Sequence, residues 1–133
     1  MIEKTFAVLK PDAVLANITG MIIYLIELNK FEIINMRKTQ LTKELAQEFY
    51  AIHKERPFFN ELVEYMTSGP VIVMMLQKEN CVQEWRDLMG ATDPLKAAPG
   101  TIRKMFGKSI GSNATHGSDS VENAKIELDL FFK

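Results

Sequence analysis

The chain has 133 residues, enough for one domain with its own apolar core, and we expect residues 1–133 to form that single domain. Its 16 lysines and arginines and 17 aspartates and glutamates leave a net charge of −1, which argues against a protein dedicated to coating nucleic acid or anionic membranes. One cysteine excludes an internal disulfide framework, and with only two histidines it excludes a Cys/His zinc site within the chain.

Apolar patterns predict alternating strands and helices in the first half of the chain. Residues 5–9 are β-branched and apolar, which predicts a strand, and Pro11 should end it because proline cannot donate to the sheet. Residues 21–28 stay apolar over more than a typical strand length, which favours a helix. Residues 32–38 predict a second strand, and Thr42 has the side chain of an N-cap before the next helix.

The second half begins with a predicted short helix that Asn60 is expected to cap. Residues 71–76 form a continuous apolar run, which is typical of a buried strand. Asn80 and Gln83 have the spacing of a capping box before a further helix, and Gly90 lies where the glycine after a helix belongs. This alternation of strands and helices predicts an α/β sandwich rather than a doubly wound sheet.

The regular pattern lapses between Gly90 and His116, in a stretch rich in glycine and proline. An irregular segment longer than ~15 residues inside a domain is usually functional or mobile. Beyond this segment, Asp119 and Glu122 indicate the start of a last helix. The side chains at the two ends of this segment are therefore candidate functional residues.

Residues 113–120 are the part of the chain richest in side chains that can do chemistry. His116 stands beside Gly117, and a glycine at that place permits a ligand or a backbone to approach closely. Side chains of the types that bind phosphate occur elsewhere in the sequence, at Lys10, Arg86, Thr92 and Arg103. Two interpretations of these residues are about equally favoured. In one they form a phosphate site that uses a histidine, and in the other His116 is structural and the cations are solvated.

The segment at residues 113–120, Asn-Ala-Thr-His-Gly-Ser-Asp-Ser, resembles the active-site signature of nucleoside diphosphate kinases. The resemblance covers essentially the whole chain, and supporting segments occur in the family's order: Lys10-Pro11-Asp12, Tyr50 with Arg56 to Phe59, Ser68-Gly69-Pro70, Thr92-Asp93-Pro94 and Pro99 to Arg103. It implies the α/β (α+β) class, with a ferredoxin-like α/β sandwich whose four-stranded antiparallel sheet is covered by helices.

Nucleoside diphosphate kinases move the γ-phosphoryl group of a nucleoside triphosphate to a nucleoside diphosphate by a ping-pong mechanism through a phosphohistidine. By position, the resemblance makes His116 the nucleophile, with Glu127 as the partner that fixes the imidazole tautomer and Ser118 in support. It also implies catalytic roles for Tyr50 and Lys10. Mg²⁺ is the implied cofactor, held mainly by the nucleotide phosphates, and no protein side chain is assigned as its ligand.

The resemblance further implies a site that binds a nucleotide through its phosphates, ribose and base. The residues that it assigns to nucleotide binding are Lys10, Tyr50, His53, Phe58, Leu62, Arg86, Thr92, Arg103, Ile110, Asn113 and Gly117. Among these, Lys10 and Asn113 match residues that hold the ribose hydroxyls, Phe58 matches the aromatic that stacks on the base, and Ile110 matches the residue on the other face. Because every base has a π-face, we expect broad base use.

The expected partners are nucleoside di- and triphosphates and further copies of the chain. The resemblance implies a homo-oligomer, and a tetramer and a hexamer both remain open. The N-terminus has no signal-peptide pattern and no apolar stretch approaches the ~20 residues that cross a bilayer, so we expect a cytoplasmic protein with no membrane partner. The net charge predicts no dedicated nucleic-acid binding.

Two other functions stay open at this point. A regulatory nucleotide-binding module could use the same fold without turnover, although every matched catalytic position is filled here. A phosphate site could also bind polynucleotide weakly, which salt-dependent retention on DNA would reveal. A protein-histidine phosphotransfer role is a variant that the sequence does not separate from the nucleotide kinase.

Overall fold

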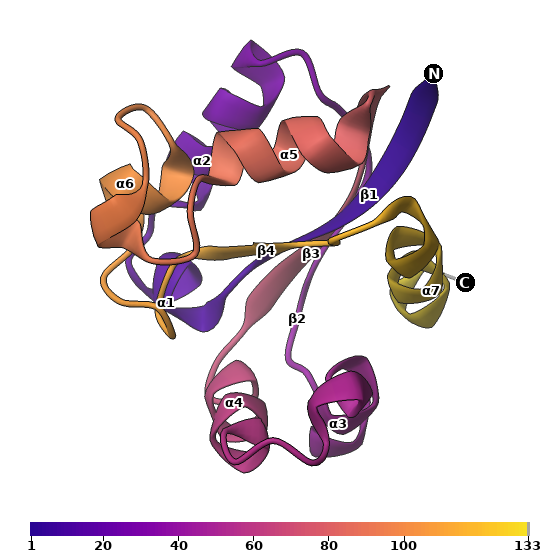
Figure 1. Ribbon diagram of the computed structural model, residues 1–133, viewed down its shortest axis with the longest axis vertical. Helices are drawn as coiled ribbons and strands as arrows, with labels where there is room; N and C mark the ends of the chain where they lie inside the picture. The colour runs from indigo at the N-terminus through magenta and orange to yellow at the C-terminus, as the bar shows by residue number, and fades with distance from the viewer. Residues whose placement is uncertain (133) are drawn as a thin grey trace.

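The computed structural model describes residues 1–132, which fold around a four-stranded antiparallel sheet (Figure 1). The strands are β1 (Ile2–Leu9), β2 (Glu32–Thr39), β3 (Val71–Glu79) and β4 (Thr115–Gly117). Their order across the sheet is β2-β3-β1-β4, and each neighbouring pair is antiparallel. The long strands β1 and β3 form the middle of the sheet, while β2 and the short β4 form its two edges. The predicted antiparallel α/β sandwich is therefore confirmed.

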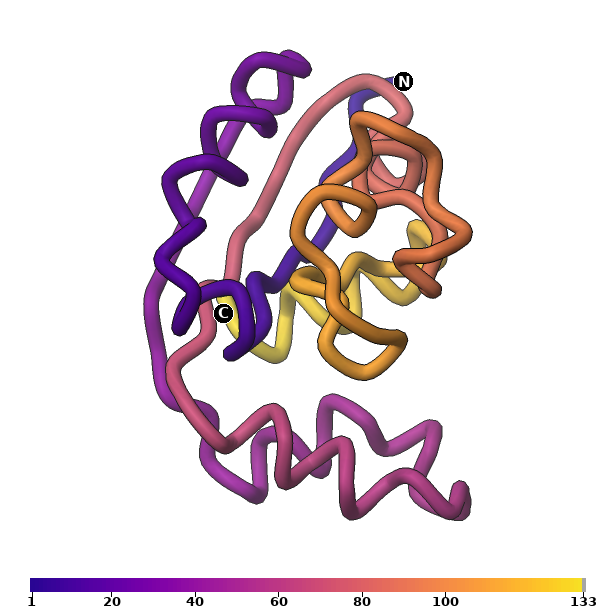
Figure 2. Tube along the Cα trace, turned by 90° about the vertical axis from the view of Figure 1, so that its left-hand side faces the viewer, coloured from indigo at the N-terminus to yellow at the C-terminus, as the bar shows by residue number. Residues whose placement is uncertain are grey.

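Helices cover both faces of this sheet. They are α1 (Pro11–Leu15), α2 (Thr19–Leu28), α3 (Lys43–Phe49), α4 (Phe59–Met66), α5 (Cys81–Met89), α6 (Ile102–Phe106) and α7 (Val121–Phe131), with 3₁₀ turns η1 (Ala51–His53) and η2 (Pro94–Lys96). Helices α3 and α4 lie side by side below the sheet in both views (Figures 1 and 2). Within the described residues, every helix is too short or too polar to cross a bilayer.

The alternation of side chains along β1 divides the apolar core between the two faces. Phe6 and Val8 point into one core, which buried residues of α3, α4 and α7 complete. Ala7 and Leu9 point into the other core, together with residues of α1, α2, α5 and α6. This period of two is the geometry of a strand, and it buries β1 on both sides. Burial on both faces thus fixes the register of β1 without any contribution from its edge neighbour β4.

The predicted elements largely match the structure, and the helix starts show the clearest differences. Thr42 caps α3 as predicted, because its hydroxyl accepts a hydrogen bond from the Leu45 amide at 3.1 Å. The prediction for Asn60 is wrong, since α4 begins at Phe59 and has no side-chain cap. The capping box at Asn80 is also wrong, because Asn80 adopts the left-handed conformation with φ 55° and ψ 41° and its side chain makes no cap bond.

The segment after α5 is less irregular than the sequence indicates. It contains η2 and α6, each started by a short polar side chain. Asp93 accepts a hydrogen bond from the Leu95 amide at 3.0 Å, and Thr101 accepts one from the Lys104 amide at 3.3 Å. Helices of this length carry too little apolar periodicity to be recognised from the sequence. The same limit applies to β4, which has three residues and was not predicted.

Candidate active site

A cavity of about 850 Å³ lies between the α3–α4 pair, helix α5 and the segment that precedes β4. In Figure 2 the orange segment of residues 91–112 approaches the α3–α4 pair at the base of the view, and side chains of both line the cavity. A cavity of this size is within the range of small-molecule sites. The predicted site residues that line it are Lys10, Tyr50, Phe58, Leu62, Arg86, Thr92, Arg103, Ile110, Asn113, His116 and Gly117.

Three predicted site residues do not line the cavity. Ser118 and Glu127 lie behind His116, where Glu127 is next to the imidazole and Ser118 is hydrogen-bonded to Glu127. His53 lies in η1, and its ring centroid is 5.5 Å from that of Phe58. The structure therefore brings most of the predicted residues together around one cavity, with two more in support of His116.

The backbone of His116 is held by strand pairing with β1 and by a side chain of α5. In β4 it stands opposite Val8 of the buried β1. From α5, Trp85 donates a hydrogen bond from Nε1 to the His116 carbonyl oxygen at 3.3 Å. Gly117 allows this approach, because a Cβ on Gly117 would lie 2.6 Å from Trp85 Nε1 and 2.6 Å from Met89 Cε. The glycine is thus required by packing against α5.

The imidazole of His116 has different surroundings at its two nitrogens. Its Nε2 lies 3.5 Å from Glu127 Oε1, and the Ser118 hydroxyl donates to that same oxygen at 2.7 Å. A carboxylate beside one ring nitrogen favours the tautomer that carries its proton there. The rings of Phe49 and Phe6 pack edge-on against the imidazole, with centroids 5.0 and 6.4 Å away. These contacts fix the ring plane and leave Nδ1 free of a hydrogen-bond partner among residues 1–132.

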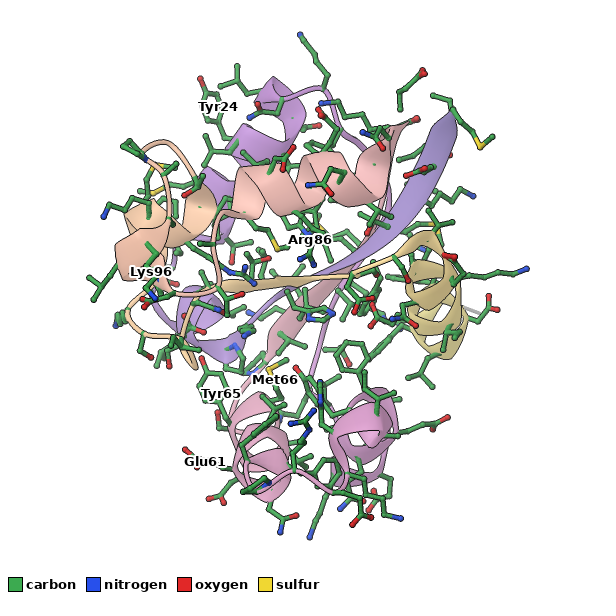
Figure 3. The ribbon with its side chains drawn as sticks, viewed as in Figure 1. Tyr24, Glu61, Tyr65, Met66, Arg86 and Lys96 are labelled. Atoms are coloured by element: carbon green, nitrogen blue, oxygen red, sulfur yellow. The ribbon has the colours of Figure 1, made fainter. Side chains whose placement is uncertain are left out.

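Cationic side chains gather on the wall of the cavity next to His116. Burial and the nearby charge of Arg103 lower the pKa of Lys10 to about 8, although Asp12 opposes the shift. Burial and the nearby charge of Arg86 lower the pKa of Arg103 to about 10. Figure 3 shows Arg86 extending from α5 toward the sheet. These cations are buried and repel one another. A bound anion offsets both the cost of burial and the repulsion, so the cluster is a preorganised anion site.

Arg103 also forms hydrogen bonds with the backbone on two sides of the cavity. Its Nη1 donates to the Gly90 carbonyl oxygen at 3.0 Å, and its Nη2 donates to the Thr115 carbonyl oxygen at 2.9 Å. These bonds join the end of α5 to the start of β4. The buried Nε has no partner among residues 1–132, so part of the donor capacity of this guanidinium is unused.

Four polar side chains at the cavity were missed by the sequence analysis: Glu61, Tyr65, Ser109 and Ser112. A signal for Tyr65 was present, since Phe58, Leu62 and Tyr65 are spaced by four and three residues and so share one face of α4. Figure 3 shows Tyr65 at the end of α4 nearest α1, with Glu61 one turn away. Carboxylates are sparse here, and residues 1–132 contain no group of three or more His, Cys, Asp or Glu side chains arranged to hold a metal ion.

Comparison with known proteins shows which family the chain resembles. Residues 3–133 match the family described as nucleoside diphosphate kinase. The nucleoside diphosphate kinase of Methylobacterium radiotolerans is 55% identical over 131 residues, which cover 98% of this chain and 94% of that protein. That of a Nitratiruptor species is 58% identical over 130 residues, which cover 98% and 95%.

The fold agrees as well as the sequence. The crystal structure of the Aquifex aeolicus nucleoside diphosphate kinase superposes with a TM-score of 0.97 at 40% identity, over 100% of this chain and 96% of that one. Both kinds of likeness extend over 98% or more of the chain. The chain therefore belongs to the nucleoside diphosphate kinase family, whose enzymes transfer phosphoryl groups between nucleotides by a ping-pong mechanism through a phosphohistidine.

Proposed function

We propose that His116 is the residue that carries the phosphoryl group and that Nδ1 is its attacking atom. The observation that supports this most strongly is the contact of Nε2 with the Glu127–Ser118 pair, which leaves the lone pair on Nδ1 directed away from that carboxylate. In the first half-reaction Nδ1 bonds to the γ-phosphorus, the bond to the bridging oxygen breaks, and the nucleoside diphosphate leaves with that oxygen. In the second, an oxygen of another diphosphate attacks the same phosphorus and restores the imidazole.

Arg86 and Arg103 are proposed to bind the phosphates, with Thr92 as a hydroxyl donor, and the charge of Lys10 lies next to them. Phosphoryl transfer depends mainly on position and on neutralising charge, which a cluster of desolvated cations supplies. Nucleotide kinases also require a divalent metal ion, and we propose Mg²⁺. The cavity wall is rich in cations and has no carboxylate cluster, which fits a metal ion bound to the phosphates rather than to the protein. Such an ion would neutralise charge on the phosphate oxygens.

The base and ribose are proposed to occupy the outer part of the cavity. Phe58 and Ile110 line the cavity with 46% and 60% of their surface exposed, so they offer apolar faces to a base, and Leu62 lies on the same wall. Lys10 and Asn113, joined by a 2.8 Å hydrogen bond, are proposed to hold the ribose hydroxyls, and His53 to lie near the α-phosphate. Stacking tolerates any base, so we expect broad base use.

A labelling experiment tests the proposed function. Incubation with γ-labelled ATP and Mg²⁺ without a diphosphate should leave label on the chain in an acid-labile, alkali-stable bond. Addition of ADP, GDP, CDP or UDP should each discharge it. Failure to label while nucleotide still binds would contradict the phosphohistidine mechanism here, and discharge by one base alone would contradict broad base use.

The pKa of Lys10 leads to a pH prediction. We expect kcat/KM to hold up to about pH 8 and then to fall toward tenfold per pH unit, because kcat/KM reports the free enzyme and Lys10 loses its charge above that pH. Steady-state rates from pH 7 to 9.5 measure this. Lys10→Arg keeps the charge at higher pH and should remove the decline. A wild-type profile that stays flat through pH 9.5 would argue against a charged Lys10 in binding.

We also propose that the chain acts as a single domain and associates with further copies through β2. This edge strand has eight residues, and Ile34 and Met36 on it are 41% and 46% exposed. Long edge strands with exposed apolar side chains tend to pair with another strand. Light scattering of the purified chain measures its mass directly, and a monomer at micromolar concentration would refute this association.

A further inference from the structure

The carboxylate of Asp12 connects two segments that are far apart in the sequence. Its Oδ1 accepts a hydrogen bond from the Tyr65 hydroxyl on α4. Its Oδ2 accepts a hydrogen bond from the backbone amide of Ala114 at 3.0 Å. The Tyr65 hydroxyl in turn accepts a hydrogen bond from the Asp12 amide at 3.3 Å. Helix α4, the start of α1 and the residues before β4 therefore meet at one carboxylate.

The backbone that Asp12 holds at Ala114 is conformationally unfavourable. Ala114 has a φ of 76°, in the left-handed region that residues with a Cβ seldom adopt. Such a conformation persists where surrounding contacts fix it. Two backbone contacts do so here, since the Ala114 amide donates to Asp12 and the Ala114 carbonyl oxygen accepts from the Lys10 amide at 2.9 Å. Asp12 is thus one of the two anchors of this turn.

The turn at Ala114 sets the position of the two side chains next to it on the cavity wall. Asn113 is almost completely buried, and its Oδ1 accepts a hydrogen bond from Lys10 Nζ at 2.8 Å. Its Nδ2 donates to the Thr92 carbonyl oxygen at 3.0 Å. Hydrogen bonds from Tyr65 through Asp12 to Ala114, and from Asn113 to Lys10, are therefore linked through the peptide bond between Asn113 and Ala114.

We propose that Tyr65 and Asp12 are positioning residues, which fix the turn at Asn113–Ala114 and thereby hold Lys10 and Asn113 in the geometry that binds nucleotide. The proposal rests on the proposed function to the extent that Lys10 and Asn113 face the nucleotide. It does not depend on His116, which is held separately by β1, Trp85 and Glu127.

Tyr65 is able to serve as a donor at every pH at which the enzyme would be studied. Burial and the hydrogen bond to Asp12 raise its pKa to about 12. The Tyr65 hydroxyl thus keeps its proton and donates a hydrogen bond to the Asp12 carboxylate. A charged acceptor makes this bond stronger than one between neutral groups. Removal of the hydroxyl should therefore loosen Asp12 measurably.

The first test is Tyr65→Phe, which removes only the hydroxyl. We expect ADP to bind about three- to tenfold more weakly by calorimetry, the size of effect expected for one lost hydrogen bond. The rate at saturating nucleotide should change less than twofold, because the contacts of His116 are untouched. Tyr24→Phe is the matched control, since Tyr24 is exposed and lies on α2 at the far end of the molecule from Tyr65 in Figure 3. Unchanged ADP affinity in Tyr65→Phe would overturn the proposal.

A double-mutant cycle separates positioning through Asn113 from an independent effect of Tyr65. If Tyr65 acts through Asn113, then Tyr65→Phe should have little further effect on ADP affinity in an Asn113→Ala background. Additive losses would show that Tyr65 affects ADP binding independently of Asn113, as a direct contact from the cavity wall would, and would overturn the proposal. The cycle measures ADP affinity and the labelling experiment measures phosphoryl transfer, so the two proposals can fail separately. Additive losses in the cycle would contradict the role of Tyr65 even if His116 is labelled. An unlabelled chain would contradict the phosphohistidine mechanism even if the losses are not additive.

Asp12→Asn provides a second variant, in case Tyr65→Phe does not fold. Among the charged groups that act on Lys10, Arg103 lowers its pKa and Asp12 raises it. Removal of the Asp12 charge should therefore move the alkaline decline of kcat/KM below pH 8 in addition to weakening ADP binding. Tyr65→Phe keeps that charge and should leave the decline near pH 8. An Asp12→Asn enzyme with wild-type affinity and pH profile would contradict the proposed role.

Discussion

Replacement of His116 by alanine is expected to abolish both labelling of the chain and turnover. The loss should be roughly 10⁴-fold or more, because His116 is the only imidazole among the residues that line the cavity. The fold should survive, since β4 is held by its backbone pairing with β1 and by the bond from Trp85 to the His116 carbonyl oxygen, neither of which needs the imidazole. Labelling with γ-labelled ATP, steady-state rates and thermal melting measure the three quantities.

His53→Ala is the matched control for this experiment, because His53 is the only other histidine of the sequence. It lies in η1 beside Phe58 and away from the Glu127–Ser118 pair. The His53→Ala chain should still be labelled, even if its nucleotide affinity changes. Label that persists in His116→Ala and disappears in His53→Ala would reverse the assignment.

Replacement of Gly117 by alanine is expected to have the second largest effect. The added methyl group would lie 2.6 Å from Trp85 Nε1 and from Met89 Cε, and both side chains are fully buried or nearly so. Overpacking of this kind costs about 1–3 kcal/mol and should lower the melting temperature by roughly 5–10 °C. Relief of the clash requires β4 to move away from α5, so phosphoryl transfer by the neighbouring His116 should fall as well.

Gly20→Ala provides the comparison, because it adds the same methyl group in α2 with no atom within 4 Å. Alanine is the better helix former, so this variant should melt at the wild-type temperature or slightly above it. Equal melting temperatures for Gly117→Ala and Gly20→Ala would show that α5 yields to the methyl group and that packing does not require a glycine at 117.

The family and the fold could be predicted because their signals are local. The histidine segment at residues 113–120 is contiguous, and the runs of β1 and β3 are long enough for their apolar patterns to be recognised. The predicted side chains around the cavity came from the same resemblance, position by position. Their types were informative, but nothing in their spacing alone could place Lys10 beside Asn113, which lies 103 positions away.

Other features depend on contacts that a sequence pattern does not carry. Strand β4 has three residues and exists because β1 offers it an edge. Asn80 resembles a helix cap by composition, but the turn out of β3 requires a left-handed residue there, and that need decides its conformation. The role of Asp12 likewise appears only when Tyr65 and Ala114 are brought to it by the tertiary fold.

The position of His116 on β4 also determines when this protein becomes competent during synthesis. The strand pairs only with β1, and its Thr115 hydroxyl reaches the Val8 carbonyl oxygen across 107 positions of sequence. Contacts of such separation form late, because the long intervening chain must first be ordered. A ribosome must therefore release the chain beyond β4 before His116, the proposed phosphoryl carrier, meets its strand partner. Chains interrupted before β4 lack His116 and also lack Leu128 and Phe131 of α7, which complete one of the two cores, so they would have neither the proposed phosphoryl carrier nor a complete fold.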